Sequence, residues 1–309
     1  MNNIFCLKNP ILEIRNLHKS FKKFKALNGV SLTVNQGEIF GFLGCNGAGK
    51  STTIRCLLTL IKPDSGEILF KGKNINECRS EFLSSVGCIV EKPDFYKNLS
   101  LETNLKLSAM LYNKNPTKKV IYDSLELVGL KGKEKVKFKA CSQGMKQRLG
   151  IAAALIHDPE IIILDEPSNG LDPRGMIELR QLILRMKNEM KKTIIISSHI
   201  LSEVELIVDS LIIIDKGVNV IQGSAKELLH GSDVMVNIET TEINRLAEKI
   251  KNSVYNSQLE SVSENHILMK STMNEVATMH KDIILMDEPI QNFYTRKKLE
   301  DLFLKLTEN

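Results

Sequence analysis

Short apolar runs alternate with segments of helical spacing through the first two thirds of the chain. The run Ile161-Ile162-Ile163-Leu164 is apolar at every position, as is typical of a strand covered on both faces of a sheet. Comparable runs predict further strands at 11–17, 38–43, 86–90, 193–197 and 211–214. Helical spacing predicts helices at 50–61, 117–128, 145–155 and 175–187. This alternation indicates an α/β fold with a largely parallel sheet.

The pattern changes in two places, which suggests how the chain is divided. Residues 92–159 are mainly helical, so we expect a helical lobe between two strands of the sheet. A boundary is expected near residues 215–223. Beyond residue 231 the pattern becomes short alternating pieces, such as 234–238, and ends in an amphipathic segment at 296–306. We therefore expect an N-terminal extension at 1–10, a main domain at 11–230 and a small α+β domain at 231–309.

Composition and charge exclude several classes of protein. The chain has 42 lysines and arginines against 37 acidic residues, for a net charge of +5, and no basic block marks a nucleic-acid tail. No window approaches the roughly 20 apolar residues of a membrane-spanning helix, so another chain must cross the membrane if this protein works there. None of the six cysteines has the spacing of a zinc or thioredoxin-like site, which predicts free thiols in a reducing compartment.

A glycine-rich segment lies between a predicted strand and a predicted helix. It fits the pattern G-x-x-x-x-G-K-[ST], in which backbone N–H groups wrap a phosphate chain at a helix N-terminus. We expect Lys50 to reach the β- and γ-phosphates of a nucleotide and Ser51 to bind Mg²⁺. The predicted nucleotide-binding residues are Gly44, Cys45, Asn46, Gly47, Ala48, Gly49, Lys50, Ser51 and Thr52.

Two carboxylates follow the most apolar strand. Asp165 and Glu166 would stand at its carboxyl end, where ligands bind in open α/β sheets. We expect Asp165 to hold a metal ion through water and Glu166 to act as general base toward an attacking water. The alternative is a strand end capped by solvated acids.

A short polar segment with a glycine begins a predicted helix between these two motifs. Its residues are Ser142, Gln143, Gly144 and Met145. Exposed N–H groups and the helix dipole could bind an anion there. An ordinary N-cap is the other interpretation, and the sequence leaves both open.

Taken in order, these motifs resemble those of the ATP-binding subunit of ABC transporters, over roughly residues 11–229. The resemblance implies a P-loop NTPase core of the ABC ATPase type. Residues 44–52 would be the Walker A loop, with Cys45 where proline is most usual. Asp165 and Glu166 would be the Walker B pair.

The same resemblance assigns roles to residues outside these two motifs. Residues 141–145 would form the signature motif, usually L-S-G-G-Q, with cysteine, glutamine and methionine as departures from it. Asp172 would lie in the D-loop. His199 would be the switch histidine that contacts the γ-phosphate, although a lone histidine after a strand is more often an ordinary loop residue. Phe21 would stack on adenine, but Phe24 competes for that role and a half-buried core position is the alternative.

One departure from the family pattern is informative. Most transporter ATPases have glutamine where Glu91 stands, in the loop that joins the core to the helical lobe. A carboxylate there can approach Mg²⁺ or the attacking water but cannot donate a hydrogen bond, so the change should alter coupling more than nucleotide binding. This glutamate, the residues at 93–99 and the tail at 299–307 resemble the subfamily that exports or repels lantibiotics and bacitracin in Gram-positive bacteria.

The resemblance implies an ATP-binding and hydrolysing subunit that uses ATP and Mg²⁺ to power export or removal of a peptide antibiotic. The expected partners are integral membrane permease subunits and a second ATPase subunit, as a homodimer, without nucleic acid. Each ATP would lie between the Walker A loop of one copy and residues 142–145 of the other. The protein would be peripheral, on the cytoplasmic face of the cell membrane. The alternative is a soluble ABC-type ATPase that serves an assembly process other than transport.

A second segment, at 283–289, imitates the Walker B motif. No second phosphate loop or signature precedes it, so we expect it to be a strand end in the small domain. It therefore adds no second nucleotide site.

Overall fold

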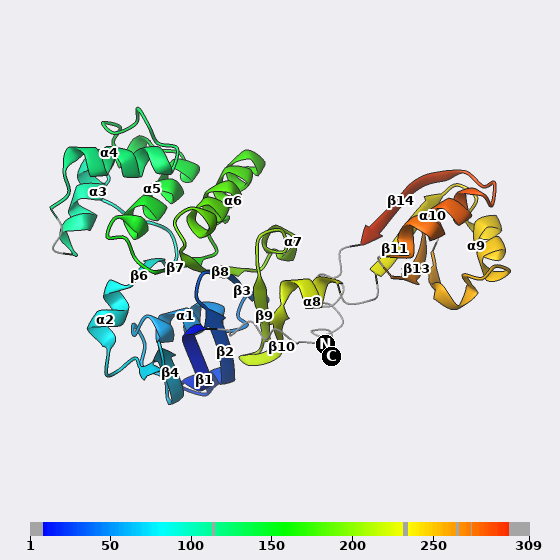
Figure 1. Ribbon diagram of the computed structural model, residues 1–309, viewed down its shortest axis with the longest axis horizontal. Helices are drawn as coiled ribbons and strands as arrows, with labels where there is room; N and C mark the ends of the chain where they lie inside the picture. Colours follow the sequence, from blue (N-terminus) through cyan, green and yellow to red (C-terminus); the bar gives the residue numbers. More distant parts are fainter. Residues whose placement is uncertain (1–8, 113–114, 231–233, 264–265, 273, 297–309) are drawn as a thin grey trace, which may run out of the picture. The chain divides into compact units, whose positions relative to one another are not determined.

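The chain forms two compact units, Met1–Gly223 and Ser224–Asn309 (Figure 1). This division falls at the end of the segment 215–223, where a boundary is expected, and ahead of the change of pattern at residue 231. The computed structural model describes residues 9–112, 115–230, 234–263, 266–272 and 274–296. Within these residues, none of the helices is both long enough and apolar enough to cross a bilayer.

A six-stranded, largely parallel sheet is the centre of the first unit. Its strands are β3 (Ile39–Leu43), β6 (Val86–Ile89), β7 (Ile161–Asp165), β8 (Thr193–Ser198), β9 (Ser210–Asp215) and β10 (Val218–Ser224), in the order β10-β9-β3-β8-β7-β6. Pairing from β9 through β3, β8 and β7 to β6 is parallel. Every residue of β3, β7 and β8 is buried, as expected for strands covered on both faces. The predicted parallel sheet is confirmed.

A second, antiparallel sheet was only partly foreseen by the sequence pattern. It consists of β1 (Pro10–Phe21), β2 (Phe24–Asn35), β4 (Ser65–Phe70) and β5 (Lys73–Asn74), in the order β2-β1-β4-β5. Only β1 was predicted. In β2, buried Val30, Leu32 and Val34 alternate with more exposed positions, so the strand has one buried face and no continuous apolar run.

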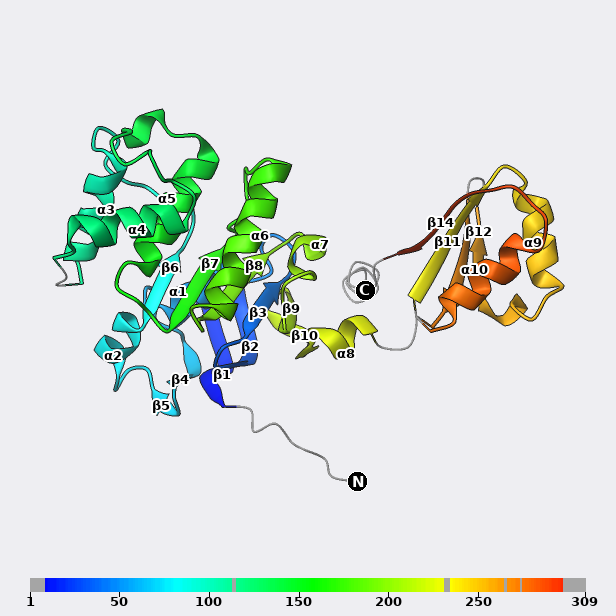
Figure 2. The ribbon, with the colours of Figure 1, turned by 45° about the horizontal axis from the view of Figure 1, so that its top comes forward.

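The helical lobe is inserted between two neighbouring strands, β6 and β7, as the sequence predicts. Its helices are α3 (Leu101–Met110), α4 (Lys118–Leu127), the short η1 (Phe138–Ala140) and α5 (Gln143–Leu155). Figure 2 shows these helices gathered together. Gly87 of β6 lets α5 approach closely, because a Cβ on Gly87 would stand 2.0 Å from the carbonyl oxygen of Ala154.

The remaining helices of the first unit flank the sheets. They are α1 (Lys50–Leu57), α2 (Arg79–Ser84), α6 (Pro173–Asn188) and α7 (Leu201–Val204). The predicted helix at 50–61 was too long, because Thr59 adopts a left-handed φ of +56°. The N–H of Leu60 then donates to the carbonyl of Arg55, a hydrogen bond that closes the helix end.

The second unit is a small α+β sandwich. It contains α8 (Ala225–His230), β11 (Val234–Thr240), α9 (Ile243–Lys251), η2 (Asn256–Gln258), β12 (Leu259–Val262), β13 (Ile267–Ser271), α10 (Val276–Ile284) and β14 (Ile290–Arg296). The strand order β12-β13-β11-β14 with antiparallel pairing is that of a split βαβ fold. Its core joins side chains of β11 and β13 to those of α9 and α10.

Two segments of this unit, 283–289 and 296–306, differ from the prediction or lie outside the described residues. The segment 283–289 is not a strand end: Ile283 and Ile284 close α10, because Met279 and Ile283 form a buried i, i+4 stripe of a helix. The predicted amphipathic segment at 296–306 lies outside the described residues, apart from the backbone of Arg296.

Candidate nucleotide site

The glycine-rich segment forms the loop between β3 and α1. Gly44 and Gly49 have φ values of +154° and +110°. A Cβ on Gly44 would stand 2.4 Å from the carbonyl oxygen of Ile214, and one on Gly49 would stand 2.8 Å from that of Ala26. Only glycine fits at these two positions. The loop therefore passes tightly against its neighbours and delivers the N-terminus of α1, which has no side-chain cap and no acidic residue in its first turn.

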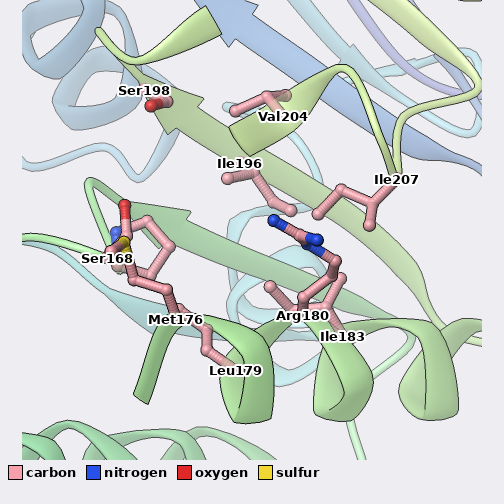
Figure 3. Close-up of a pocket in the computed structure, with 10 residues that line it drawn as sticks. Ser168, Met176, Leu179, Arg180, Ile183, Ile196, Ser198, Val204 and Ile207 are labelled. Carbon is pink, nitrogen blue, oxygen red and sulfur yellow. The ribbon is translucent and has the colours of Figure 1, made fainter. Parts of the chain in front are cut away.

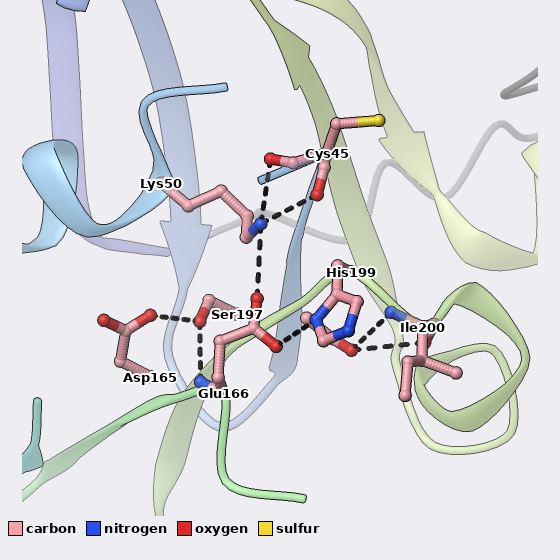
Figure 4. Close-up of polar contacts among 9 residues, drawn as sticks. Cys45, Lys50, Asp165, Glu166, Ser197, His199 and Ile200 are labelled. Carbon is pink, nitrogen blue, oxygen red and sulfur yellow. Dashed lines mark hydrogen bonds and ion pairs between the residues drawn. The ribbon is translucent and has the colours of Figure 1, made fainter. Parts of the chain in front are cut away.

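Lys50 lies over this loop and is only 5% exposed. Its Nζ donates to the carbonyl oxygens of Gly44, at 2.7 Å, and Cys45, at 3.2 Å. It also lies 3.2 Å from Oε1 of Glu166 (Figure 4). The sulfur of Cys45 is turned away from Lys50 in the same view. The ammonium group is thus held at the mouth of the loop.

Asp165 and Glu166 meet Ser197 of the neighbouring strand. The hydroxyl of Ser197 donates to Oδ1 of Asp165 and accepts from the N–H of Glu166, at 2.9 Å. Asp165 is 5% exposed, and Ser197 is fully buried. Glu166 has a left-handed φ of +49°, which turns the chain sharply out of β7. The pair is therefore held by the core and is not a solvated strand end.

His199 completes this cluster. It follows β8, and its Nδ1 lies 2.6 Å from Oε2 of Glu166. The Glu166 carboxylate therefore stands between Lys50 on one oxygen and His199 on the other (Figure 4). Three predicted segments, separate in sequence, meet here. Ser197 was missed, because its role is visible only once β8 is known to lie beside β7.

Glu91 has a different environment. It lies in the loop after β6 with a left-handed φ of +68°, and its carboxylate forms an ion pair with Arg55 of α1. Among the described residues, the side chain of Glu91 makes no hydrogen bond or ion pair with the phosphate loop. Arg55 was missed by the sequence analysis, although its place four residues after Ser51 puts both on one face of α1.

The segment expected to form the signature motif begins α5. Ser142 is the N-cap, and its Oγ accepts from the N–H of Met145 at 3.3 Å. Asp172 caps α6 in the same manner, through Oδ1 and the N–H of Gly175 at 2.9 Å. The ordinary N-cap interpretation of Ser142 therefore describes its geometry within this chain. Gln143 and Gly144 occupy the first turn of the helix.

The two candidate aromatic residues are partners at the end of the β1–β2 hairpin. Phe21 pairs with Phe24 in the antiparallel register. Their exposed fractions are 45% and 63%, so neither ring is a core residue. The ammonium of Lys19 lies 5.7 Å from the ring centroid of Phe21. Either exposed ring is free to stack on a flat ligand.

A partly open apolar pocket lies beside this cluster but is too small for a nucleotide. It is formed between α6 and β8, with Ser168 and Ser198 near one end and apolar side chains such as Leu179, Ile183 and Ile196 along it (Figure 3). The space inside it that water can enter is about 30 Å³, which is far too little for a nucleotide. Among the residues that the structure describes, no three His, Cys, Asp or Glu side chains are grouped as a metal site.

Known proteins share these motifs and this fold. The family model described as ABC transporter matches residues 27–169. The chain is 49% identical over 209 residues to the bacitracin transport ATP-binding protein BcrA of Bacillus licheniformis, covering 68% of each chain. It is 36% identical over 299 residues to BcrA of Enterococcus faecalis, covering 96% of each chain. The chain belongs to the ABC transporter ATP-binding proteins.

Two further relatives support the fold and activity of this ABC ATPase. It is 44% identical over 207 residues to the lantibiotic transport ATP-binding protein SrtF of Streptococcus pyogenes, covering 67% of this chain and 88% of that one. The structure of cbiO1 from Clostridium perfringens, part of the ABC transporter complex cbiONQ, matches with a TM-score of 0.65 and 27% identity. That match covers 81% of this chain and 98% of cbiO1. The expected ABC ATPase fold is confirmed, and the protein binds and hydrolyses ATP.

Proposed function

We propose that this ABC ATPase powers the removal of a peptide antibiotic, of the bacitracin or lantibiotic type, through separate membrane permease subunits. The 49% identity to a bacitracin transport ATP-binding protein carries this proposal. The similarity to a lantibiotic transport ATP-binding protein supports the same class of substrate. Glu91 stands where glutamine is usual in the family, and this feature of the sequence also suggests the bacitracin and lantibiotic subfamily.

The phosphate loop and Lys50 would bind the triphosphate of ATP. The uncapped first turn of α1 offers N–H groups to the β-phosphate, and Lys50 would exchange its carbonyl partners for phosphate oxygens. Residues 44–49 form the cradle, and Ser51 and Thr52 continue it into the first turn of the helix. Phe21, exposed at the end of its hairpin, would stack on adenine.

The oxygen donors near this loop fit Mg²⁺. Ser51 offers a hydroxyl, and Asp165 offers a buried carboxylate that is fixed by Ser197. Magnesium takes few protein ligands and completes its shell with water and phosphate oxygens, so a pair of donors is sufficient. Glu91 would be a further oxygen donor from the adjoining loop. When bound, Mg²⁺ would neutralise charge that develops on the β- and γ-phosphates.

Glu166 would act as general base in hydrolysis. Its carboxylate would accept a proton from the water that attacks the γ-phosphate, yielding ADP and inorganic phosphate. His199 lies 2.6 Å from the other carboxylate oxygen, which fixes the orientation of the base. From this position His199 would also contact the γ-phosphate.

A second copy of the chain would complete each ATP site. Residues 142–145 begin α5 at a helix N-terminus, whose N–H groups and dipole suit the γ-phosphate held by another copy. Asp172 is the N-cap of α6 and would lie at the same contact between the two copies. We propose a homodimer with two equivalent sites.

The groove between the Glu91 loop and the helical lobe would receive the permease. It has a volume of about 270 Å³ and is lined by Cys88, Lys92, Phe95, Leu111, Tyr112 and Ala153, among others. Leu111 is 84% exposed and Tyr112 is 38% exposed, which is a considerable apolar surface for one helix end. Docking there would place the protein peripherally on the cytoplasmic face of the membrane.

Antibiotic susceptibility tests this proposal. A strain that has the partner permeases but lacks this gene would receive the wild-type protein, Glu166→Gln, or Glu160→Gln as an exposed control. We expect wild type and the control to raise the minimal inhibitory concentration of bacitracin or a lantibiotic, and Glu166→Gln to leave it low. Equal susceptibility with and without the wild-type protein would contradict the proposed function.

A further inference from the structure

Helix α1 presents two functional groups on one face. Ser51 and Arg55 are four residues apart, so their side chains lie on neighbouring turns, about 6 Å apart along the axis. Ser51 is half-buried next to the phosphate loop, whereas the side chain of Arg55 is 37% exposed. The same helix face thus leads from the expected metal position to a guanidinium group.

Glu91 reaches this face from another part of the chain. Its carboxylate pairs with Arg55, one helical turn beyond Ser51. The side chain is 66% exposed, so it is not fixed by burial, and its backbone has a left-handed φ of +68°. Within the described part of the chain, the one ion-pair partner of this carboxylate is Arg55. A change of partner therefore requires little repacking.

We propose that Arg55 is a positioning residue that competes with nucleotide-bound Mg²⁺ for the carboxylate of Glu91. The inference rests on the proposed Mg²⁺ position at Ser51. A carboxylate between two cationic partners one turn apart can be bound fully by only one of them at a time. A neutral glutamine at this position would carry no net charge for which the two could compete.

A change of partner by Glu91 would be transmitted to the helical lobe through Pro93. Two residues after Glu91, Pro93 packs against α5, where a Cβ on Gly150 would stand 2.7 Å from Cγ of Pro93. Helix α5 begins at Gln143, in the expected signature segment. Movement of Glu91 from Arg55 toward Ser51 would therefore shift the loop against the helix that faces the second ATP site. Arg55 sets the position from which this movement starts.

The simplest alternative is a surface ion pair without any role in metal binding. Exposed pairs contribute little to stability, and removal of Arg55 would then leave the metal dependence of nucleotide binding unchanged. The two interpretations differ in whether removal of Arg55 changes the metal dependence, and only the proposed one makes that change require Glu91. A double-mutant cycle separates them.

The measurement is the affinity for AMP-PNP, a non-hydrolysable ATP analogue, with excess Mg²⁺ and again with EDTA. The proteins are wild type, Arg55→Gln, Glu91→Gln and the double variant. The ratio of the EDTA Kd to the Mg²⁺ Kd should rise about two- to fivefold in Arg55→Gln, the range expected for loss of one exposed pair. In the Glu91→Gln background, Arg55→Gln should leave the ratio unchanged.

Two further variants guard against indirect effects. Arg55→Lys keeps the charge and should keep the wild-type ratio. Arg15→Gln removes another exposed arginine that pairs with a glutamate, Glu13, and should also have no effect. An equal change in both Glu91 backgrounds, or no change in either, would overturn the inference.

This test does not involve an antibiotic or a permease. If the susceptibility experiment failed while the cycle gave the expected coupling, the transport proposal would be wrong and the role of Arg55 would stand. A wild-type affinity that did not depend on Mg²⁺ would overturn the inference together with the metal site on which it rests.

Discussion

Glu166 has a cationic or basic partner on each carboxylate oxygen, Lys50 on one and His199 on the other. Its left-handed backbone aims the side chain out of β7 toward the phosphate loop. A carboxylate held on both sides is fixed in orientation, which is the requirement for a base that must meet one particular water molecule. The cluster thus joins phosphate binding and proton transfer at one side chain.

Glu166→Gln should bind ATP with nearly wild-type affinity and lose hydrolysis. Glutamine keeps the shape of the side chain but cannot accept the proton, so we expect the rate to fall by about 100-fold or more. Phosphate release measures the rate, and a fluorescent ATP analogue measures the affinity. Retained turnover would remove Glu166 as the base.

Lys50→Ala should weaken nucleotide binding itself. The buried ammonium is the cation at the mouth of the loop, and its loss removes a charge-assisted bond to the phosphates that is worth about 1.5–3 kcal/mol, or about 10- to 100-fold in Kd. Equilibrium binding of ATP measures the change. Lys71→Ala, at an exposed lysine paired with Glu160, is the matched control. An affinity equal to that of the control would contradict the role of Lys50.

Residues in continuous motifs could be predicted, and residues that depend on the neighbouring strand or loop could not. Gly44 and Lys50 belong to a local pattern whose backbone requirements are visible in the sequence. Ser197 and Arg55 are ordinary residues in the sequence and gain importance from what lies beside them, the Walker B carboxylates and Glu91. No local pattern signals such pairings.

At the scale of elements, the buried parallel strands were predicted well because they are continuously apolar. The antiparallel sheet was largely missed because β2 alternates, β4 is buried only in its second half and β5 is two residues long. The predicted helix at 50–61 was too long because the left-handed turn at Thr59 is not encoded by a glycine. Segment 283–289 was misassigned because an apolar run of this length fits the end of a helix as well as a strand.

The helical lobe contains an ion pair that should make its stability depend on pH. Glu102, in the first turn of α3, accepts hydrogen bonds from Lys135 and from the hydroxyl of Tyr122, at 3.0 Å. The bond from Lys135, followed by that from Tyr122, lowers the pKa of the Glu102 carboxyl below its ordinary value of 4.5. Its contribution to stability is therefore complete above the ordinary pKa and is lost as pH falls through the lowered one.

Glu102→Gln should lower the free energy of unfolding at neutral pH by about 0.5–1 kcal/mol, because the Lys135 side chain is mostly exposed. The difference from wild type should vanish as the pH falls below the lowered pKa. Urea unfolding across a pH series measures both effects. Glu126→Gln, which breaks the more exposed pair with Lys131, is the control and should have a smaller effect. A difference that persists in acid would contradict this assignment.

At the scale of the whole molecule, each unit has an apolar core of its own among the described residues. A separate second unit was predicted from the change of pattern beyond residue 231, and the division itself falls at the end of the expected boundary segment, 215–223. Leu246 is fully buried in the second core, between α9 and the sheet. This makes it a probe of the second unit alone.

Leu246→Ala should destabilise the second unit by about 2–5 kcal/mol, the usual cost of a cavity left by a buried leucine. Because the core residues described for the second unit do not include any of the nucleotide site, the affinity for ATP should stay at the wild-type value. Denaturant unfolding and equilibrium ATP binding are the measurements, and Val254→Ala, at an 85% exposed residue of the same unit, is the control. A parallel loss of ATP affinity would show that the two units depend on each other.

The central claim is that this ATPase works with membrane permeases in antibiotic removal, and the most direct measurement is identification of its partners. The tagged protein would be expressed in its native cell, membranes solubilised gently, and co-purifying proteins identified by mass spectrometry. We expect polytopic membrane permeases, and their deletion should raise sensitivity to bacitracin or lantibiotics. Recovery of soluble proteins alone would contradict the account and favour an ABC-type ATPase in an assembly process.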